Sequence, residues 1–228
     1  MEAVAKKQLQ VTACKVRMGI IEGVHAAKSG HPGGSLSCAD ILTYLYFKEM
    51  NIDPKDPKKA DRDRLVLSKG HAAPALYSVL ANRGYFDAEL LATLRHPGSI
   101  LQGHPDMKHI PGVDMSTGSL GQGISAAVGM ALSSMHFGDN YNVYAILGDG
   151  EIEEGQVWEA AMFAANKKLS NLTAFIDYNN LQIDGTIEEV NSAAPIDAKF
   201  EAFGWHTITI NGNDFDEIEK AVNEAKTV

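Results

Sequence analysis

The most informative stretch of the sequence is Ile146-Leu147-Gly148-Asp149-Gly150-Glu151, an apolar run that ends in Gly-Asp-Gly. The residues from Asn142 to Leu147 predict a buried strand, and the pattern over Glu153 to Lys168 predicts a helix after it. In open α/β sheets, ligands bind at the carboxyl ends of the strands, where glycine lets the backbone approach closely. A carboxylate there can hold a divalent cation while amides face a phosphate, although the same residues also suit a simple turn.

The next predicted strand, Leu172 to Asp177, ends in the same way and is followed by Asn179-Asn180-Leu181. One helix and one strand separate Asp149 from Asn179. Since consecutive parallel strands are usually neighbours, we expect both side chains at the same edge of the sheet. Carboxylate, amide and carbonyl oxygens are the ligands that Mg²⁺ or Ca²⁺ prefers. The spacing therefore predicts a metal site made by Asp149, Asn179 and the Leu181 carbonyl.

Elsewhere the chain alternates between helical and strand patterns. We expect helices that end near residue 27, that run from a capping Ser37 to Met50, and that cover 73–83, 87–95, Gly121–Phe137, 196–203 and 214–225. Further strands are expected at Leu65–Leu67 and His206–Ile210. The small residues after Gly121 predict a tightly packed, buried helix. The alternation predicts an α/β fold in one domain over residues 1–228, with a doubly wound, mostly parallel sheet and helices on both faces.

Composition narrows the class of protein. The 228 residues are 45% hydrophobic and 21% charged, with a net charge of −9, so a general nucleic-acid binder is disfavoured. No apolar run approaches the roughly 20 residues needed to span a bilayer, and a membrane partner is not expected. The two cysteines form no paired motif, which favours a reducing, cytoplasmic location.

Three Gly-His dipeptides follow breaks in periodicity, at Gly30-His31, Gly70-His71 and Gly103-His104. A single histidine in a loop is more often solvated or structural. Three such loops beside a predicted phosphate and metal site favour a functional role, because imidazole can donate hydrogen bonds to oxygen atoms and shuttle protons near neutral pH. We therefore predict that His31, His71 and His104 converge on one cleft with Asp149.

At these residues the chain resembles the transketolases. Gly-Asp-Gly, about 28 intervening residues and Asn-Asn resemble their thiamine-diphosphate motif. Further segments resemble transketolase in the same order, and they cover nearly the whole chain: 29–33, 69–72, 102–105, 117–123, 148–155 and 183–185. One departure is Ser119, where many transketolases carry proline; we expect the loop to keep its path.

The resemblance implies thiamine diphosphate with Mg²⁺ (or Ca²⁺) as cofactors, and transfer of a two-carbon ketol unit between sugar phosphates, as in the pentose phosphate pathway. It implies that His71 contacts the diphosphate, and that His31 and His104 contact the sugar hydroxyls and the nascent carbonyl oxygen. It places Glu154 in a carboxylate network at the subunit interface, with Glu159 also matching a family glutamate. The remaining implied cofactor-binding residues are Gly118, Leu120, Asp149, Gly150, Asn179 and Leu181.

The resemblance also implies a divided enzyme. The pyrimidine-binding and C-terminal domains of full-length transketolases are absent from this sequence, including the glutamate that activates the cofactor. We therefore expect the N-terminal subunit of a split transketolase, shortened at its C-terminus, that forms a homodimer and needs a C-terminal partner subunit. The alternatives are a half-subunit of a deoxyxylulose-phosphate synthase-like enzyme, an unusual-sugar transketolase, or a catalytically silent cofactor-binding module. A 2-oxo acid dehydrogenase subunit fits the histidine loops poorly.

Overall fold

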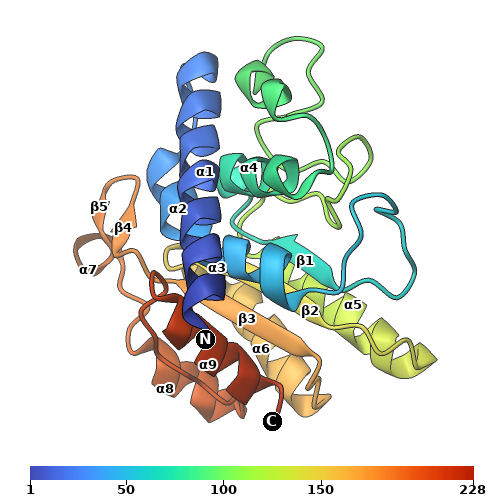
Figure 1. Cartoon of the computed structure of the whole chain (residues 1–228). Helices are drawn as coiled ribbons and strands as arrows, with labels where there is room; N and C mark the ends of the chain where they lie inside the picture. Colours follow the sequence, from blue (N-terminus) through green and yellow to red (C-terminus); the bar gives the residue numbers. More distant parts are fainter.

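The centre of the molecule is a three-stranded parallel sheet in the order β1-β2-β3, in a computed structural model that describes residues 1–228 (Figure 1). The strands are β1 (Arg64–Leu67), β2 (Val143–Gly148) and β3 (Leu172–Asp177). All residues of β2, the middle strand, are buried, as expected for a parallel strand covered on both faces. The register places Gly148 opposite Asp177, so β2 and β3 end side by side.

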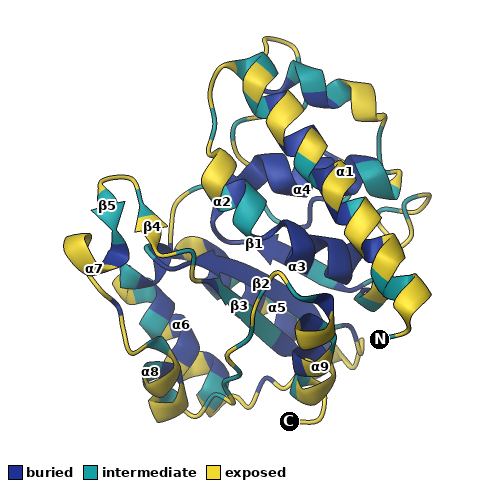
Figure 2. Ribbon diagram, turned by 60° about the vertical axis from the view of Figure 1, so that its left-hand side comes forward, coloured by how far each residue is buried: buried dark blue, intermediate teal, exposed yellow.

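Helices cover both faces of the sheet. One face carries α5 (Gln122–Phe137) and α6 (Gly155–Asn166). The other carries α1 (Ala3–Ala27), α3 (Ala39–Tyr44), α4 (Ala73–Arg83) and α9 (Phe215–Ala225). Alternate residues of β2 enter the two cores: Tyr144 and Ile146 pack with the α1 side, and Ala145 and Leu147 with the α5 side. Figure 2 shows β2 as a buried strand. The predicted parallel α/β fold is therefore confirmed.

Shorter elements complete the chain. They are α2 (Pro32–Ser37), a π-helical turn (Leu45–Glu49), 3₁₀ turns (Gly70–Ala72, Ala88–Thr93, Glu151–Glu153), β4 (Leu181–Gln182), β5 (Gly185–Thr186), α7 (Ile187–Val190) and α8 (Ile196–Phe203). The antiparallel β4–β5 hairpin and α7 project beside the end of β3 (Figure 1). No helix combines the length and apolar character that a membrane crossing requires. Cys14 is exposed, Cys38 is buried, and neither forms a disulfide.

Two expectations in the first half are corrected in part. The helix expected from Ser37 to Met50 is present as α3 and the π-helical turn that ends at Glu49. The separate helix α2 before it was not expected, and it begins at Pro32 because proline fits the first turn of a helix. The Ser37 hydroxyl does not cap α3 and instead donates to the Asp177 carboxylate at 2.5 Å. The helix expected over 87–95 is only the short 3₁₀ turn from Ala88 to Thr93.

Two further expectations fail for reasons of long-range packing. The strand expected over His206–Ile210 is absent, since the segment has no neighbouring strand with which to pair and simply joins α8 to α9. The helix α5 has the expected bounds but is buried on one face only. Its outer face exposes Gly129, Met135 and Phe137.

Candidate active site

Asp149 lies at the carboxyl end of β2 and connects it to the end of β3. The residue is only 3% exposed. Its Oδ1 accepts a hydrogen bond from the Gly150 amide at 2.9 Å, and its Oδ2 accepts one from the Asn180 amide at 2.7 Å. Burial raises the pKa of Asp149, and these amides oppose that rise. The two strand-end loops are thus held together through one buried carboxylate.

Asn179 and Leu181 supply the other predicted oxygen ligands. The Asn179 Oδ1 accepts a hydrogen bond from the Leu181 amide at 3.0 Å, and its Nδ2 donates to the Ser37 hydroxyl at 3.4 Å. With Asp149, this gives one carboxylate, one amide oxygen and one backbone carbonyl, a donor set that fits Mg²⁺ or Ca²⁺. No group of three or more His, Cys, Asp or Glu side chains is arranged to hold a metal ion. A divalent cation here would need further oxygens from phosphate or water.

The histidine loops come together near this edge of the sheet. The His31 and His71 rings lie 5.1 Å apart in an edge-to-face arrangement. Burial lowers the pKa of His71 to about 4, with the Lys69 charge, His31 and His104 adding to the effect. Burial also lowers the pKa of His104, aided by Arg95 and His31. His71 and His104 are therefore uncharged at neutral pH.

Glycines let the backbones of these loops touch. A Cβ on Gly70 would lie 2.6 Å from the Gly118 nitrogen, and a Cβ on Gly118 would lie 3.0 Å from the His104 ring. A Cβ on Gly34 would lie 3.2 Å from the His71 Nε2. A Cβ on Gly150 would lie 3.4 Å from the Gln182 Cβ. The expected cofactor residues thus belong to closely packed backbone segments, in which added side chains would fill the available space.

A buried charged cluster beneath the histidines was not predicted from the sequence. Lys69 is 1% exposed, and its ammonium group donates to the Gly34 carbonyl at 2.6 Å and forms an ion pair with Asp177. Asp177 also accepts the hydrogen bond from Ser37. The cluster ties the His31 loop to the end of β3. The only sequence signal was the position of Lys69 beside the Gly70-His71 dipeptide, and nothing in the pattern indicated its burial or its partner.

The remaining predicted site residues lie at the opening of α5 and α6. Leu120 is 37% exposed just before α5. Glu154 precedes α6, and a Cβ on Gly121 would lie 2.8 Å from the Glu154 Cβ. Glu154 and Glu159 are exposed and make no side-chain hydrogen bond or ion pair within the chain.

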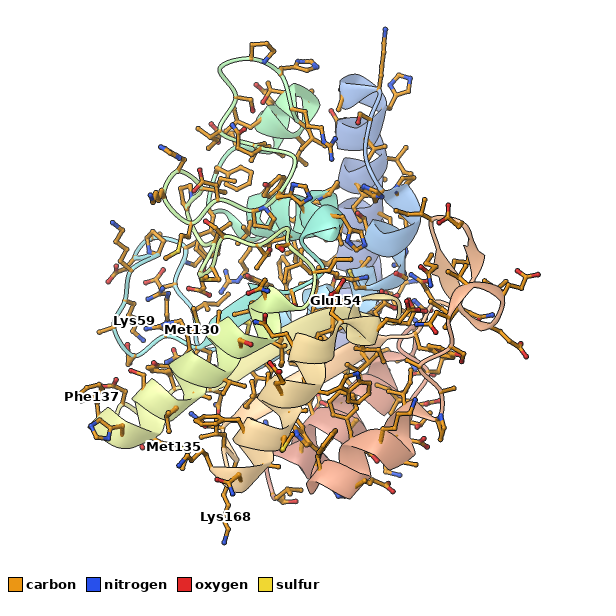
Figure 3. The ribbon with its side chains drawn as sticks, turned by 180° about the vertical axis from the view of Figure 1, so that it is seen from behind. Lys59, Met130, Met135, Phe137, Glu154 and Lys168 are labelled. Atoms are coloured by element: carbon orange, nitrogen blue, oxygen red, sulfur yellow. The ribbon has the colours of Figure 1, made fainter.

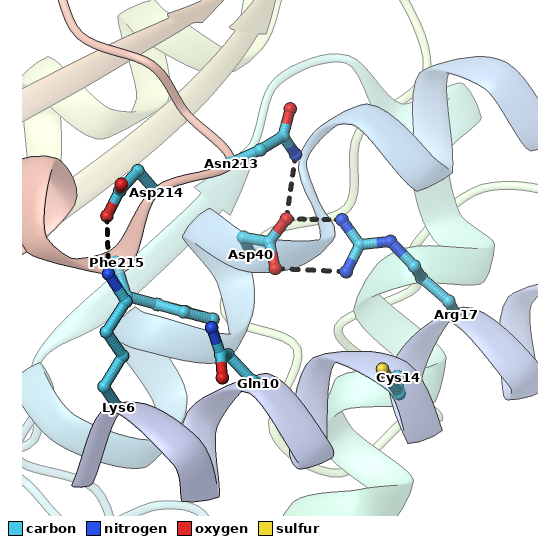
Figure 4. Close-up of a pocket in the computed structure, with 8 residues that line it drawn as sticks. All are labelled: Lys6, Gln10, Cys14, Arg17, Asp40, Asn213, Asp214 and Phe215. Carbon is cyan, nitrogen blue, oxygen red and sulfur yellow. Dashed lines mark hydrogen bonds and ion pairs between the residues drawn. The ribbon is translucent and has the colours of Figure 1, made fainter. Parts of the chain in front are cut away.

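A surface cavity lies elsewhere in the molecule (Figure 4). It has a volume of about 330 Å³ and lies between α1, the start of α3 and the start of α9. The charged side chains that line it form ion pairs with one another: Arg17 pairs with Asp40, and Lys6 pairs with Asp214. Asn213 donates to Asp40 at 2.8 Å. The chemistry-bearing residues of the sequence motifs do not line this cavity.

The protein has a parallel sheet, and the ends of its strands carry a buried carboxylate, close-packed glycines and neutral imidazoles. This arrangement is typical of α/β proteins that bind phosphorylated ligands. More narrowly, the chain belongs to the transketolase family. Residues 8–228 match the family described as transketolase, thiamine diphosphate binding domain.

Two bacterial relatives are transketolase subunits. One is the 6-deoxy-6-sulfo-D-fructose transketolase subunit SqwG of Clostridium sp. (strain MSTE9), 52% identical over 218 residues, or 96% of this chain and 79% of the relative. The other, from Phocaeicola vulgatus, is one of the subunits of an apulose-4-phosphate transketolase, 45% identical over 92% of this chain and 74% of the relative. The expected resemblance to the N-terminal subunit of a split transketolase is confirmed.

Solved transketolases share the fold. The enzyme from Leishmania mexicana superposes with a TM-score of 0.93 at 32% identity, and that from Campylobacter jejuni with 0.91 at 37%. Both matches cover 96% of this chain. The chain spans about a third of the length of these proteins, 35% and 36% respectively.

Proposed function

We propose that this chain is the diphosphate- and Mg²⁺-binding half of a thiamine-diphosphate-dependent transketolase, which transfers a two-carbon ketol unit from a ketose phosphate to an aldose phosphate. One observation carries the proposal. The hydrogen bond from the Asn180 amide to Asp149 joins the two loops of the cofactor motif in a chain that matches the family over residues 8–228. This contact supports the proposal that both loops act on one ligand.

The cofactor half-site is proposed to consist of oxygen ligands and backbone. Asp149, Asn179 and the Leu181 carbonyl hold Mg²⁺ (or Ca²⁺), which neutralises diphosphate oxygens. The backbone of Gly118, Leu120 and Gly150 packs against the same ligand, at loops where glycine permits close approach. When bound, thiamine diphosphate supplies the carbanion chemistry by which a carbon–carbon bond is broken and re-formed.

The histidines are proposed to orient the reactants. A neutral imidazole donates from one nitrogen and accepts at the other, so His71 can donate to a diphosphate oxygen. His31 and His104 are proposed to bind the sugar hydroxyls and to supply a proton to the carbonyl oxygen as its charge develops. The edge-to-face contact between His31 and His71 supports this assignment, because it brings the two rings to one place.

A partner subunit is proposed to complete the site by providing the pyrimidine-binding domain and the activating glutamate. The packed pair α5 and α6 presents exposed Met162 and Phe163, together with exposed Met135 and Phe137. Figure 3 labels Met135 and Phe137 on α5. Exposed apolar groups of this kind are typical of subunit contacts. We propose that this surface, with Glu154 and Glu159, forms a homodimer within a two-plus-two assembly. The free cysteines suit the reducing conditions of a cytoplasmic enzyme.

A second candidate concerns the substrate. Two relatives are named for 6-deoxy-6-sulfo-D-fructose and for apulose 4-phosphate, which favours an unusual-sugar transketolase over one that acts on ordinary ketose phosphates. The deoxyxylulose-phosphate synthase-like alternative and the silent module have no comparable support. The intact Asp149 and Asn179 argue against a silent module.

The test is a ketol-transfer assay on this chain mixed with its candidate partner subunit, thiamine diphosphate and Mg²⁺. An unmodified ketose phosphate, 6-deoxy-6-sulfo-D-fructose and apulose 4-phosphate are offered separately as donors, with one aldose phosphate as acceptor. Transfer from any donor supports the transketolase proposal, and the preferred donor decides between the two candidates. Cofactor binding without transfer from any of them would favour the silent module.

A further inference from the structure

Glu151 is a buried carboxylate to which the proposed reaction assigns no role. The residue follows the Gly-Asp-Gly segment directly and is 2% exposed. Its Oε1 accepts hydrogen bonds from the Ser68 hydroxyl at 2.5 Å and from the Gly121 amide at 3.0 Å. Its Oε2 accepts one from the Gly148 amide at 3.0 Å. Both oxygens are thus occupied by donors of the protein.

Each donor borders a different segment of the proposed cofactor site. Gly148 ends β2 immediately before Asp149. Gly121 ends the loop that contains the expected cofactor residues Gly118 and Leu120. Ser68 follows β1 and begins the turn that presents His71. One carboxylate therefore bridges three segments that are far apart in the sequence.

These segments are in backbone contact, so their positions are coupled. A Cβ on Gly70 would lie 2.6 Å from the Gly118 nitrogen, and a Cβ on Gly123 would lie 2.6 Å from the Ser68 Cα. At such distances one segment cannot shift without moving the next. The hydrogen bonds of Glu151 therefore influence the positions of all three segments.

The surroundings of Glu151 favour a negative charge on its carboxylate. It accepts from an amide at the N-terminus of α5, where the helix dipole favours a negative charge. Three donors to a carboxylate form hydrogen bonds that are stronger than bonds between neutral groups. They oppose the effect of burial, which raises the pKa of Glu151.

We propose that Glu151 is a positioning residue that holds the segments around Asp149, Gly118 and His71 in the geometry that receives a metal-bound diphosphate. The inference rests on the proposed function, because it assumes that these segments bind the cofactor. It assigns Glu151 no contact with substrate or cofactor. Its effect passes through the backbone amides and the hydroxyl that it holds.

The test compares Glu151→Gln with a control variant in the full chain. The amide has nearly the same size, but one carboxylate oxygen becomes an NH₂ group that cannot accept a hydrogen bond. The control is Glu188→Gln, which changes an exposed glutamate on α7 with no side-chain partner. A second variant, Ser68→Ala, keeps the carboxylate and removes only one donor.

Two measurements separate positioning from general stability. Hydrogen exchange of the unliganded chain reports on the Gly121 and Gly148 amides, and we expect roughly tenfold or faster exchange in Glu151→Gln in peptides covering 117–123 and 146–150. Calorimetry with Mg²⁺ and thiamine diphosphate is expected to show about tenfold or more weaker binding, because residues that orient metal ligands have effects of this size. Ser68→Ala should show smaller changes of both kinds. Thermal unfolding establishes that each variant is folded.

The inference is overturned if Glu151→Gln folds and neither binding nor exchange at the two segments changes relative to Glu188→Gln. A loss of thermal stability with unchanged cofactor affinity also overturns it, because that is the signature of a purely structural residue. If Glu151→Gln does not fold, Ser68→Ala decides by the same criteria. If the unaltered chain does not bind thiamine diphosphate even with its partner subunit present, the proposed function fails, and the exchange result alone decides whether Glu151 positions these segments.

Discussion

The buried carboxylate of Asp149 is the residue on which the proposed metal site depends. Asp149→Asn removes the negative charge but keeps the size of the side chain, so the fold should persist while Mg²⁺ loses its only charged protein ligand. We expect calorimetry to show that Mg²⁺ no longer strengthens thiamine diphosphate binding. The control is Asp184→Asn, in the exposed hairpin turn. Unchanged Mg²⁺ dependence in Asp149→Asn would show that the metal site lies elsewhere.

Because of His71, we expect the free energy of unfolding to depend on pH. Its pKa is lowered by burial, and then by Lys69, His31 and His104, from 6.5 to about 4. Between these values the unfolded chain binds the proton and the folded chain does not, so stability present above pH 6.5 is lost as the pH falls toward 4.

We therefore expect His71→Gln to lose less stability than the unaltered chain when the pH falls from about 7 to about 5, since glutamine cannot take up the proton. Urea unfolding at the two pH values measures the difference. His25→Gln, at the exposed end of α1, is the control. An equal loss in His71→Gln and in the unaltered chain would mean that His71 is protonated as easily in the folded state as in the unfolded one.

Sequence patterns located the residues at the ends of strands better than the residues beneath them. Asp149 and Asn179 could be paired because the strand order predicts that consecutive strand ends meet. Lys69 and Glu151 were missed because their partners, Asp177 for Lys69 and Gly121 for Glu151, are distant in the sequence. A charged residue in a loop pattern is normally exposed, and only the fold reveals that these two are buried.

At the scale of elements, the close packing of α5 against the end of β1 depends on glycine. In Gly123→Ala the added Cβ would lie 2.6 Å from the Ser68 Cα, so the helix must shift. We expect a loss of about 1–3 kcal/mol in the free energy of unfolding, measured by urea titration.

Gly129 on the same helix is the matched control, since a Cβ there meets nothing within 4 Å. Gly129→Ala should stabilise the protein by about 0.5–1 kcal/mol, because alanine favours the helix. If the two variants had equal effects, contact between α5 and Ser68 would not be the reason for glycine at position 123.

Helices and strands whose own sequence has a clear hydrophobic pattern were predicted well. Features that depend on contact with a distant segment of the chain were not. The strands β2 and β3 and the helix α4 follow from local hydrophobic periodicity. The segment His206–Ile210 has a strand-like pattern but no partner strand. The capping role expected of Ser37 was wrong because its hydroxyl bonds Asp177, more than a hundred residues away, instead of the first turn of α3.

At the scale of the whole molecule, the exposed outer surface of α5 and α6 is where we expect self-association. Phe137 is 74% exposed. Phe137→Asp places a charge in the proposed contact and should shift the chain toward monomer in sedimentation equilibrium. The control is Val4→Asp, which introduces the same charge at a residue 70% exposed on α1, on the other side of the sheet. Equal self-association of Phe137→Asp and the unaltered chain would exclude this surface.

The proposed division of the enzyme rests on two relatives that are transketolase subunits. The proposed groups of this chain bind the diphosphate end of the cofactor, and the chain matches only the thiamine-diphosphate-binding domain of transketolases. The pyrimidine pocket and the activating glutamate are assigned to a partner. The chain alone is therefore expected to bind thiamine diphosphate weakly and to lack activity.

The most direct test is ketol transfer by the purified chain, free of host transketolase, as the candidate partner subunit is titrated in with thiamine diphosphate and Mg²⁺ present. We predict no transfer by this chain or by its partner in isolation, transfer that rises with the partner until the two are equimolar, and none when the chain carries Asp149→Asn. Full turnover by the chain alone would contradict the account, as would undiminished transfer with the Asp149→Asn chain.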